Sequence, residues 1–198
     1  KARIRSKNAL QLLALEACDV GVSPTHWQKS RFPAEYHGKI QVIHEGIDLA
    51  QAKPNPHASI TLVDGRQLTR QDPIITYVAR NLEPYRGFPQ FLRALEIAQQ
   101  QHPTMQALIV GGDEVSYGNR PKDAANWREK MLREVTLDPR RTHFLGKIPY
   151  QQYLNVLQIS CAHVYLTYPF VLSWSLLEAM ACGCPIIASN TAPVREVI

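Results

Sequence analysis

A glutamate near the start of a helix is the first residue whose type and position suggest chemistry. The stretch SWSLLEAMACGCP begins at Ser173, and Glu178 follows the serines by about one helical turn. Helix N-terminal amides at Ser173 to Ser175 can hold a phosphate, and a carboxylate one turn further in can accept hydrogen bonds from ribose hydroxyls. The alternative is a capping box, in which Ser175 and Glu178 satisfy unpaired N–H groups of the helix. Spacing alone leaves both interpretations open.

Two arginines leave a predicted strand in the stretch ARNLEPYRG. Arg80 lies at the strand end and Arg86 lies just before the next helix, so both are expected at one edge of a sheet. Guanidinium groups bind phosphate oxygens in a bidentate manner, and a diphosphate would suit this pair. The alternative is a pair of surface arginines that form weak ion pairs with Glu83.

Other motifs of known chemistry are missing from the sequence. The loop GGDEVSYGN follows a strand but matches neither GxGxxG nor GxxxxGK[ST]; its Gly111-Gly112 pair either admits a ligand or a facing domain, or belongs to a plain flexible loop. No GxSxG nucleophile motif occurs. No HxxxH, HExxH or DxD occurs, and His143 and His163 are expected as hydrogen-bonded core residues. We therefore expect no metal and no cofactor.

The elements that must position these residues alternate strictly from Pro73 onward. Predicted strands cover 74–79, 105–110, 142–145, 163–167 and 185–189, and predicted helices cover 88–101, 124–135, 150–159 and 174–182. Parallel strands need crossover connections, so this alternation predicts a doubly wound, parallel, Rossmann-like α/β sheet. Ligands bind such sheets at the carboxyl ends of the strands, which directs attention to the loops 80–87, 111–121, 146–149, 168–173 and 190–193.

The N-terminal region predicts smaller elements. A helix is expected at Lys7 to Ala17 with an apolar face at positions 10, 13, 14 and 17, followed by a strand at 20–23, a short helix from about Thr25 and a strand at 39–43. Between 60–63 and 67–69, the dipeptide Asp64-Gly65 predicts a β-hairpin with a two-residue turn.

Composition limits the class of protein. The chain has 198 residues, of which 45% are hydrophobic and 20% are charged, which suits one domain or one domain plus a fragment. The net charge of +5 comes without any run of five basic residues, so a local phosphate pocket is favoured over a nucleic-acid surface. The four cysteines lack CxxC spacing and are expected as reduced core residues, with Gly183 as a helix stop. No stretch is apolar enough to span a membrane and the N-terminus lacks a signal peptide's apolar region, so we expect a cytoplasmic protein with at most peripheral membrane contact.

Four stretches of sequence together resemble one family of enzymes. VARNLEPYRGFPQFLRAL, ALIVGGDEVSYG, HFLGKIPYQQYLNVLQISCAHVYLTYPF and LLEAMACGCPIIASNTAPVREVI are similar to the C-terminal half of the retaining group 1, or family 4, glycosyltransferases of GT-B fold. The opening stretch resembles the last elements of that family's N-terminal domain. The resemblance implies a domain remnant and hinge at 1–45, and a sugar-nucleotide-binding domain at 46–198 that is truncated at its C-terminus.

The resemblance also assigns roles to residues. Arg80 and Arg86 match the basic pair that neutralises the donor diphosphate, and we expect them to be catalytic, although the family usually has lysine at the second position. Glu178 matches the second glutamate of an E-x7-E motif, which binds ribose, and Lys147-Ile148 match a stretch whose backbone contacts the base. Phe170 replaces the first glutamate, which would contact the donor sugar, and a backbone contact from Val171 to Ser173 would substitute. The implied donor-binding residues are Lys147, Ile148, Phe170, Leu172, Ser173, Trp174, Ser175 and Glu178.

The implied reaction is transfer of a glycosyl group, with retained configuration, from a nucleoside diphosphate sugar linked to UDP, GDP or ADP. The implied acceptor is a carbohydrate or a lipid-linked carbohydrate, as in polysaccharide biosynthesis. Arginines and a helix N-terminus would stabilise the leaving group without a metal. We expect the chain alone to bind nucleotide weakly and to be inactive without the family's N-terminal domain. The alternatives are a GT-B-type sugar-nucleotide epimerase and a non-catalytic Rossmann-like nucleotide-binding or scaffold domain.

Overall fold

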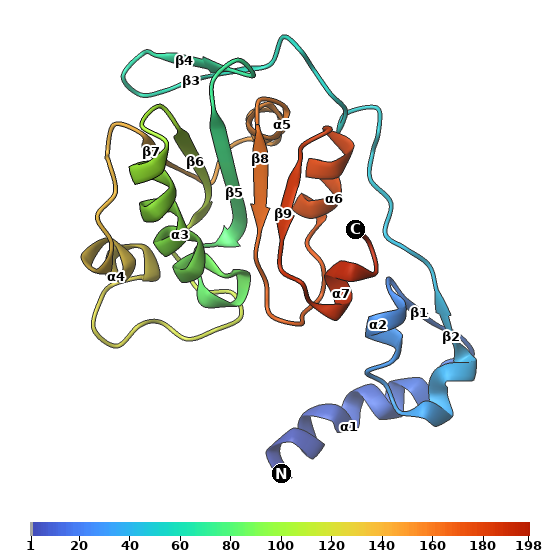
Figure 1. Cartoon of the computed structure of the whole chain (residues 1–198). Coiled ribbons are helices and arrows are strands. Elements are labelled where there is room, and N and C mark those ends of the chain that lie inside the picture. Colours follow the sequence, from blue (N-terminus) through green and yellow to red (C-terminus); the bar gives the residue numbers. More distant parts are fainter. Residues whose placement is uncertain (1) are drawn as a thin grey trace. The chain divides into compact units, whose positions relative to one another are not determined.

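The computed structural model describes the backbone of residues 2–198 and the side chains of residues 6–198. The chain forms two compact units, which are Lys1–Gly46 with Ala192–Ile198, and Ile47–Thr191. Figure 1 labels the elements of both units.

The larger unit is built on a five-stranded parallel sheet with the strand order β7-β6-β5-β8-β9 (Figure 1). The strands are β5 (Ile74–Asn81), β6 (Gln106–Gly112), β7 (Thr142–Gly146), β8 (Ala162–Tyr165) and β9 (Ile186–Ala188). The helices are α3 (Phe88–Gln101), α4 (Trp127–Glu134), α5 (Tyr150–Gln158) and α6 (Trp174–Ala181), with a 3-10 turn η2 (Pro84–Arg86) before α3. The order confirms the predicted doubly wound sheet, in which the chain changes direction between β5 and β8.

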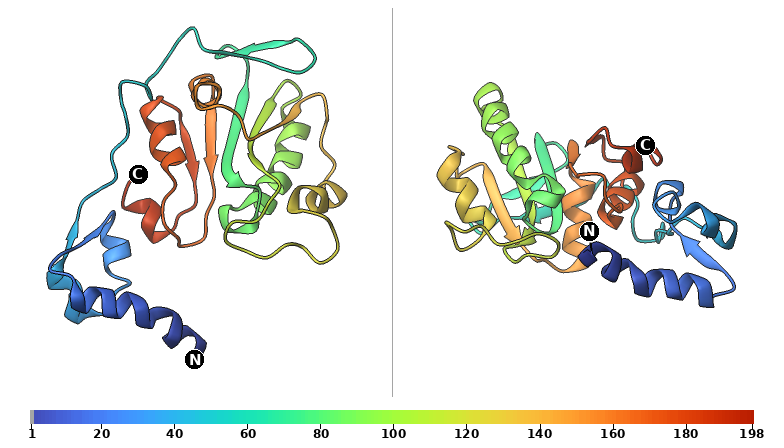
Figure 2. Two further views of the ribbon diagram at one scale, coloured as in Figure 1. Left: turned by 180° about the vertical axis from the view of Figure 1, so that it is seen from behind. Right: turned by 90° about the horizontal axis from the view of Figure 1, so that it is seen from below.

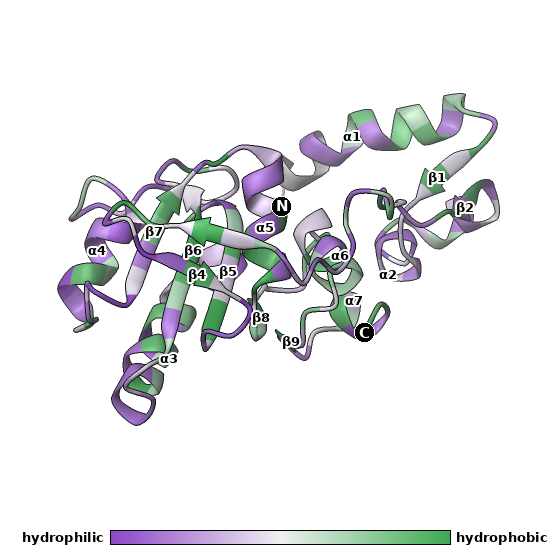
Figure 3. Ribbon diagram, turned by 90° about the horizontal axis from the view of Figure 1, so that it is seen from above, coloured by the Kyte–Doolittle hydropathy of each residue, from purple (hydrophilic) through white to green (hydrophobic). Residues whose placement is uncertain are grey.

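The central strands are buried on both faces, which explains their nearly continuous apolar sequence. Tyr77 of β5 and Ile109 of β6 are register partners and pack with α3 on one face. Leu108 of β6 packs with Val156 of α5 on the other face. Hydrophobic colouring along β5 and β6 is visible from above in Figure 3, and the sheet with α3 can be followed from behind and below in Figure 2.

Helix α3 begins and ends where the sequence predicts, and Gly87 explains its sharp start. This glycine is the N-cap with φ at 70°, a left-handed conformation that glycine adopts without strain. A Cβ atom at this position would lie 2.4 Å from Cβ of Leu166 in the loop after β8. Gly87 therefore lets the loops after β5 and β8 approach each other.

The variant Gly87→Ala is expected to lower the free energy of unfolding by about 3 kcal/mol or more, because it adds a steric overlap to an unfavourable φ. Gly65→Ala is the matched control, since Gly65 has φ at 84° with no atom within 4 Å of the added Cβ. Gly65→Ala should lower the free energy of unfolding by about 1 to 2 kcal/mol. Urea unfolding of both variants measures the difference, and equal losses would contradict the close approach.

The predicted hairpin is present as β3 (Ser59–Thr61) and β4 (Gln67–Thr69), but its turn differs from the prediction. The N–H of Leu62 donates to the carbonyl of Arg66 and the N–H of Gly65 donates to the carbonyl of Leu62, which makes a three-residue loop rather than a two-residue turn. Only Gly65 has positive φ, so Asp64 is not in the conformation that a two-residue turn requires.

The buried histidine His163 lies on β8 with no exposed surface. Its Nδ1 lies 2.9 Å from Oγ1 of Thr76, which also contacts Oγ of Ser160 at 2.8 Å. Its Nε2 is buried with no hydrogen-bond partner, so the expected core histidine is only half satisfied. Burial lowers the pKa of His163 to about 4, and the imidazole is neutral in the folded protein at neutral pH.

This histidine should make the protein less stable in mild acid. The unfolded chain takes up a proton near pH 6.5 and the folded protein only near pH 4, so stability is lost as the pH falls through that window. Between pH 7 and pH 5 the contribution amounts to about 2 kcal/mol. Urea unfolding at both values should show a smaller pH dependence in His163→Leu, and an unchanged dependence would contradict this explanation.

The smaller unit contains α1 (Ala2–Ala17), β1 (Gly21–Ser23), α2 (His26–Lys29), a 3-10 helix η1 (Ala34–Lys39), β2 (Ile40–Val42) and α7 (Ala192–Arg195). Strands β1 and β2 pair in parallel. The helix predicted at 7–17 is present, and Leu10 and Leu13 of its predicted apolar face are exposed whereas Leu15 is buried. The predicted loop at 190–193 is wrong in part, since α7 begins at Ala192. The carboxylate of Glu196, just after α7, accepts the N–H groups of His26 and Trp27 at the start of α2.

The cysteines only partly match the expectation of reduced core residues. All four are free thiols, and Cys182 and Cys184 are buried, but Cys161 is exposed and Cys18 is half-buried. Burial raises the pKa of Cys182 to about 11 and that of Cys184 to about 12, so both remain thiols at neutral pH. Gly183 has φ at 76° and ends α6 as predicted.

Candidate active site

The loops that follow β5 and β8 define the candidate site, because these neighbouring strands flank the point where the chain changes direction. The two loops touch through their backbones and side chains. The N–H of Tyr168 donates to the carbonyl of Tyr85 at 3.3 Å, and Oγ1 of Thr167 donates to the same carbonyl at 3.3 Å.

Arg86 is buried where these loops meet, with 7% of its surface exposed. Its Nη1 donates to the hydroxyl of Tyr165 at 2.8 Å, to the carbonyl of Val171 at 2.9 Å and to Oγ1 of Thr167 at 3.3 Å. Nε and Nη2 have no hydrogen-bond partner among the described residues, so two donors of the planar guanidinium are free for a ligand oxygen. Glu83 is not an ion-pair partner of Arg86, which excludes the surface ion pair for this arginine.

Phe170 belongs to an aromatic cluster around Arg86. The guanidinium carbon lies 5.2 Å from the ring centre of Phe170, 5.8 Å from that of Tyr165 and 5.9 Å from that of Tyr117. The Phe170 ring packs edge-on against Tyr117 at 4.9 Å and Tyr85 at 5.7 Å. Phe170, at the position where the resemblance implies a glutamate, therefore holds an arginine by cation–π contact.

Arg80 lies in a different environment. It is exposed at the end of β5, and its side chain makes no hydrogen bond or ion pair with the described residues. The structure thus gives Arg86 many contacts to the site and Arg80 none.

Glu83 organises the loop after β6. The carboxylate is buried with 1% exposure and accepts the N–H groups of Ser116, Tyr117 and Gly118 at 2.9 to 3.2 Å. It fixes the loop that carries Tyr117 beside Arg86.

The glycine pair Gly111-Gly112, predicted in a loop, instead ends β6, and Gly111 has a packing explanation. Gly111 has φ at 155°, and a Cβ atom there would lie 2.6 Å from the carbonyl oxygen of Ala79 on β5. The neighbouring strand thus requires the glycine, whatever binds nearby.

The start of α6 is capped by Ser173, whose Oγ accepts the N–H of Ser175 at 3.4 Å. The N–H of Ser173 donates to the Tyr165 hydroxyl at 2.9 Å, so Tyr165 joins the helix start to Arg86. The capping-box interpretation of Glu178 is wrong, because with Ser173 as N-cap the third helical position is Leu176.

Glu178 instead joins α6 to α5. Its Oε1 accepts the hydroxyl of Tyr150 at 2.8 Å and its Oε2 accepts the hydroxyl of Tyr153 at 2.5 Å, and the residue is 8% exposed. Burial, followed by the hydrogen bond to Glu178, raises the pKa of Tyr150 to about 12 and raises that of Tyr153 further. Both phenols therefore remain donors to the carboxylate. Each carboxylate oxygen keeps a second lone pair for another hydroxyl.

The remaining predicted residues lie in the loops beside these groups. Nζ of Lys147, just after β7, forms an exposed ion pair with Glu114 at 2.9 Å. Ile148 packs partly against the core under α5. Leu172 is half-buried in the loop before α6, and Trp174 is 62% exposed at its first position.

Tyr85, Tyr117, Tyr165, Tyr150 and Tyr153 are the site residues that sequence reasoning missed. Their partners lie far away in sequence, as in the hydrogen bond between Arg86 and Tyr165, so no local pattern marks them. Among the described residues, no group of three or more histidine, cysteine or acidic side chains is arranged to hold a metal ion.

Two family models divide the chain between them. The one described as "Glycosyl transferase family 4 group" matches residues 1–52, and the one described as "Glycosyl transferases group 1" matches residues 63–198, which is more than half of the chain. The chain belongs to the group 1 glycosyl transferases. This assignment confirms the part of the resemblance that concerns the group 1 glycosyltransferases.

Two relatives and one solved structure place this group 1 chain among its homologues. D-inositol 3-phosphate glycosyltransferase of Rhodococcus jostii (strain RHA1) is 28% identical over 154 residues, covering 77% of this chain and 32% of the relative. A GDP-mannose-dependent monoacylated alpha-(1-6)-phosphatidylinositol monomannoside mannosyltransferase of Corynebacterium glutamicum is 24% identical over 206 residues, covering 98% of this chain and 50% of the relative. Sucrose-phosphate synthase from Thermosynechococcus elongatus matches with a TM-score of 0.73 and 24% identity, covering 96% of this chain and 45% of that structure.

These comparisons confirm the fold class and show how much of each relative the chain covers. The group 1 chain has the parallel α/β fold of the GT-B glycosyltransferases, and it spans half or less of the length of these relatives. Among the described residues, no helix combines the length and the apolar character needed to cross a bilayer.

Proposed function

We propose that this chain is the donor-binding half of a retaining glycosyltransferase that uses a nucleoside diphosphate sugar. The observation that carries the proposal is Arg86, which is held at the junction of β5 and β8 by Tyr165 and Val171 with two guanidinium donors unused. The same tyrosine contacts the first residues of α6, the helix that carries Glu178. The group suited to a ribose therefore lies on the helix whose start is bonded, through Tyr165, to the group suited to a diphosphate.

In this proposal the diphosphate lies against Arg86 and the N-terminus of α6. Negative charge develops on the diphosphate as the bond to the sugar breaks, and fixed positive groups stabilise that charge. The Ser175 N–H, bonded at only 3.4 Å to Ser173 Oγ, can turn to a phosphate oxygen instead. Arg80, exposed at the end of β5, adds charge from the solvent side.

In this proposal the nucleoside lies beside Glu178, about one turn along α6, and beside the start of α5. Ribose hydroxyls donate to the free lone pairs of Glu178, whose orientation Tyr150 and Tyr153 fix. The backbone of Lys147 and Ile148, between β7 and α5, contacts the base.

In this proposal the surface that faces the donor sugar differs from the one that the E-x7-E motif implies. Phe170 supplies a ring edge rather than a carboxylate, and the loop from Val171 to Ser173 supplies backbone groups. Two of those groups, the Val171 carbonyl and the Ser173 N–H, are already bonded to Arg86 and Tyr165, so Leu172 carries the remaining contact.

The relatives support a nucleotide-linked donor and a carbohydrate acceptor. The Corynebacterium relative is described as GDP-mannose-dependent, and both curated relatives are described as transferring sugars to inositol-containing molecules. We propose a UDP-, GDP- or ADP-linked donor, an acceptor bound with the help of an N-terminal domain, and a cytoplasmic enzyme with at most peripheral membrane contact.

Calorimetric titration of the chain with UDP, GDP and ADP tests this function. Saturable binding of one nucleoside diphosphate with one-to-one stoichiometry is expected. Binding of none of the three would favour a scaffold domain and contradict the donor-binding role.

A further inference from the structure

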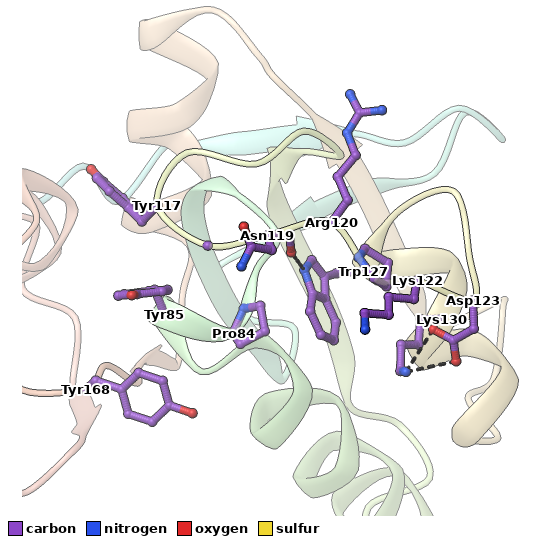
Figure 4. A pocket seen from close by; sticks show the side chains of 12 residues that line it. Pro84, Tyr85, Tyr117, Asn119, Arg120, Lys122, Asp123, Trp127, Lys130 and Tyr168 are labelled. Carbon is purple, nitrogen blue, oxygen red and sulfur yellow. Dashed lines mark hydrogen bonds and ion pairs between the residues drawn. The ribbon is translucent and has the colours of Figure 1, made fainter. Parts of the chain in front are cut away.

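A pocket of about 600 Å³ lies beside the candidate site, between the loop after β5 and the long loop that connects β6 to α4. Figure 4 shows Tyr85, Tyr117 and Tyr168 on one side of it and Trp127 on the other, with Asn119 between them. Tyr85 and Tyr117 also belong to the aromatic cluster around Arg86. The pocket is therefore separated from the arginine by a single layer of rings.

The polar groups of this pocket are free to bind a ligand. The hydroxyls of Tyr85 and Tyr168 and the side-chain amide of Asn119 have no hydrogen-bond partner among the described residues, whereas the Tyr117 hydroxyl points away from Trp127 (Figure 4). Asn119 uses only its backbone carbonyl, which accepts the indole N–H of Trp127 at 2.9 Å. Flat ring faces together with several unpaired hydroxyl and amide groups match a sugar, which has apolar C–H faces and many hydroxyls.

The charges of the pocket favour an anion. Arg120, Lys122 and Lys130 line it, and its one carboxylate, Asp123, is paired with Lys130 at 2.9 Å. Lys122 has no ion-pair partner among the described residues, and in Figure 4 its side chain lies beside Trp127 while Arg120 extends away along the rim. A lysine ammonium at the edge of an aromatic pocket is suited to a phosphate or a carboxylate.

We propose that this pocket binds a saccharide unit that carries an anionic group, either a phosphate or a carboxylate. The sugar ring lies between Trp127 and the tyrosines, its hydroxyls bond to the phenols of Tyr85 and Tyr168 and to Asn119, and Lys122 pairs with the anion. The inference rests on the pocket alone and not on the donor site. In the proposed transferase, this saccharide is part of the acceptor.

Indole N–H resonances of the chain in ¹H–¹⁵N NMR spectra test the proposal. The three tryptophans, Trp27, Trp127 and Trp174, lie on different elements, and Trp127→Phe assigns the resonance of interest. Mannose 6-phosphate and glucuronic acid represent the two anions, and mannose and inorganic phosphate are the partial ligands. At least one anionic sugar should shift the Trp127 resonance saturably and leave Trp27 and Trp174 unmoved, with mannose and phosphate binding about tenfold more weakly.

The variant Lys122→Gln should weaken the anionic sugar about tenfold and leave mannose unchanged. Lys53→Gln removes the same charge from an exposed position outside the pocket and should change neither. Affinities for both anionic sugars that equal the affinity for mannose would overturn the anionic specificity, and no shift with any sugar would overturn the site. If a nucleoside diphosphate shifts the Trp127 resonance and no sugar does, the pocket binds a nucleotide and the inference is overturned. If the sugar binds in this pocket but no nucleoside diphosphate binds at the candidate site, the inference is supported and the proposed donor-binding function is contradicted.

Discussion

Replacing Arg86 by alanine is expected to weaken the binding of a nucleoside diphosphate by about 100-fold. Nε and Nη2 both face the diphosphate in this account, and a hydrogen bond to a charged group contributes about 1.5 kcal/mol or more. Two such bonds correspond to about two factors of ten in affinity. Because the arginine contacts only the diphosphate, the affinity for the uncharged nucleoside should change by no more than about twofold. Calorimetric titration of both proteins with both ligands measures the difference.

Two further variants separate ligand binding from loop structure. Arg93→Ala removes an exposed arginine of α3 that pairs with Glu134, and it should leave both affinities unchanged. Arg86→Lys keeps the charge but loses the planar guanidinium, so its affinity for the nucleoside diphosphate should lie between those of the native chain and the alanine variant. A loss of affinity in Arg86→Ala that is equal for nucleoside and diphosphate would show that the arginine acts only by holding Val171 and Tyr165 in place.

The variant Glu178→Gln should remove the preference for ribose. A carboxylate that accepts ribose hydroxyls contributes about 1.5 to 3 kcal/mol, so the nucleoside diphosphate should bind at least about tenfold more weakly. The 2′,3′-dideoxy form lacks those hydroxyls, and its affinity should be nearly the same for native chain and variant. The measurement is the ratio of the two affinities in each protein.

Tyr153→Phe is the control for the structural role of Glu178. Its hydroxyl bonds to the same carboxylate, so its removal disturbs the contact between α5 and α6 without removing the ribose ligand. We expect a lower melting temperature with the ribose preference retained. Equal binding of the ribose and dideoxy forms by the native chain would contradict the role of Glu178 as a ribose ligand.

The sheet and most of its helices could be predicted because their signals are local. Strands buried on both faces have long apolar runs. Helix α3 begins after Gly87 and ends at Gln101, where its amphipathic pattern also ends. The predicted start of α4 was three residues early because the side chain of Asn126 caps the helix by accepting the N–H of Glu129. The short helix α7 has too few residues to produce a periodic pattern.

The candidate site could be located from sequence, but its contacts could not. Arg86 and Glu178 were identified from residue type and loop order. Their partners Tyr165 and Tyr153 come from elements that meet only in the folded sheet, as does the contact between Arg86 and the Phe170 ring. Spacing alone does not tell which arginine is held in the site. Arg80 lies at the end of β5, the strand that precedes Arg86, yet its side chain is exposed with no partner among the described residues.

The central claim is that one nucleoside diphosphate spans Arg86, the start of α6 and Glu178. Backbone amide resonances in ¹H–¹⁵N spectra of the native chain, recorded during titration with the nucleoside diphosphate that binds, test it most directly. We expect the largest shifts at 86–87, 147–148 and 171–178, with the amides of Ser173 and Ser175 among them. Shifts confined to the pocket around Trp127, or spread over the smaller unit with none in 171–178, would contradict this claim.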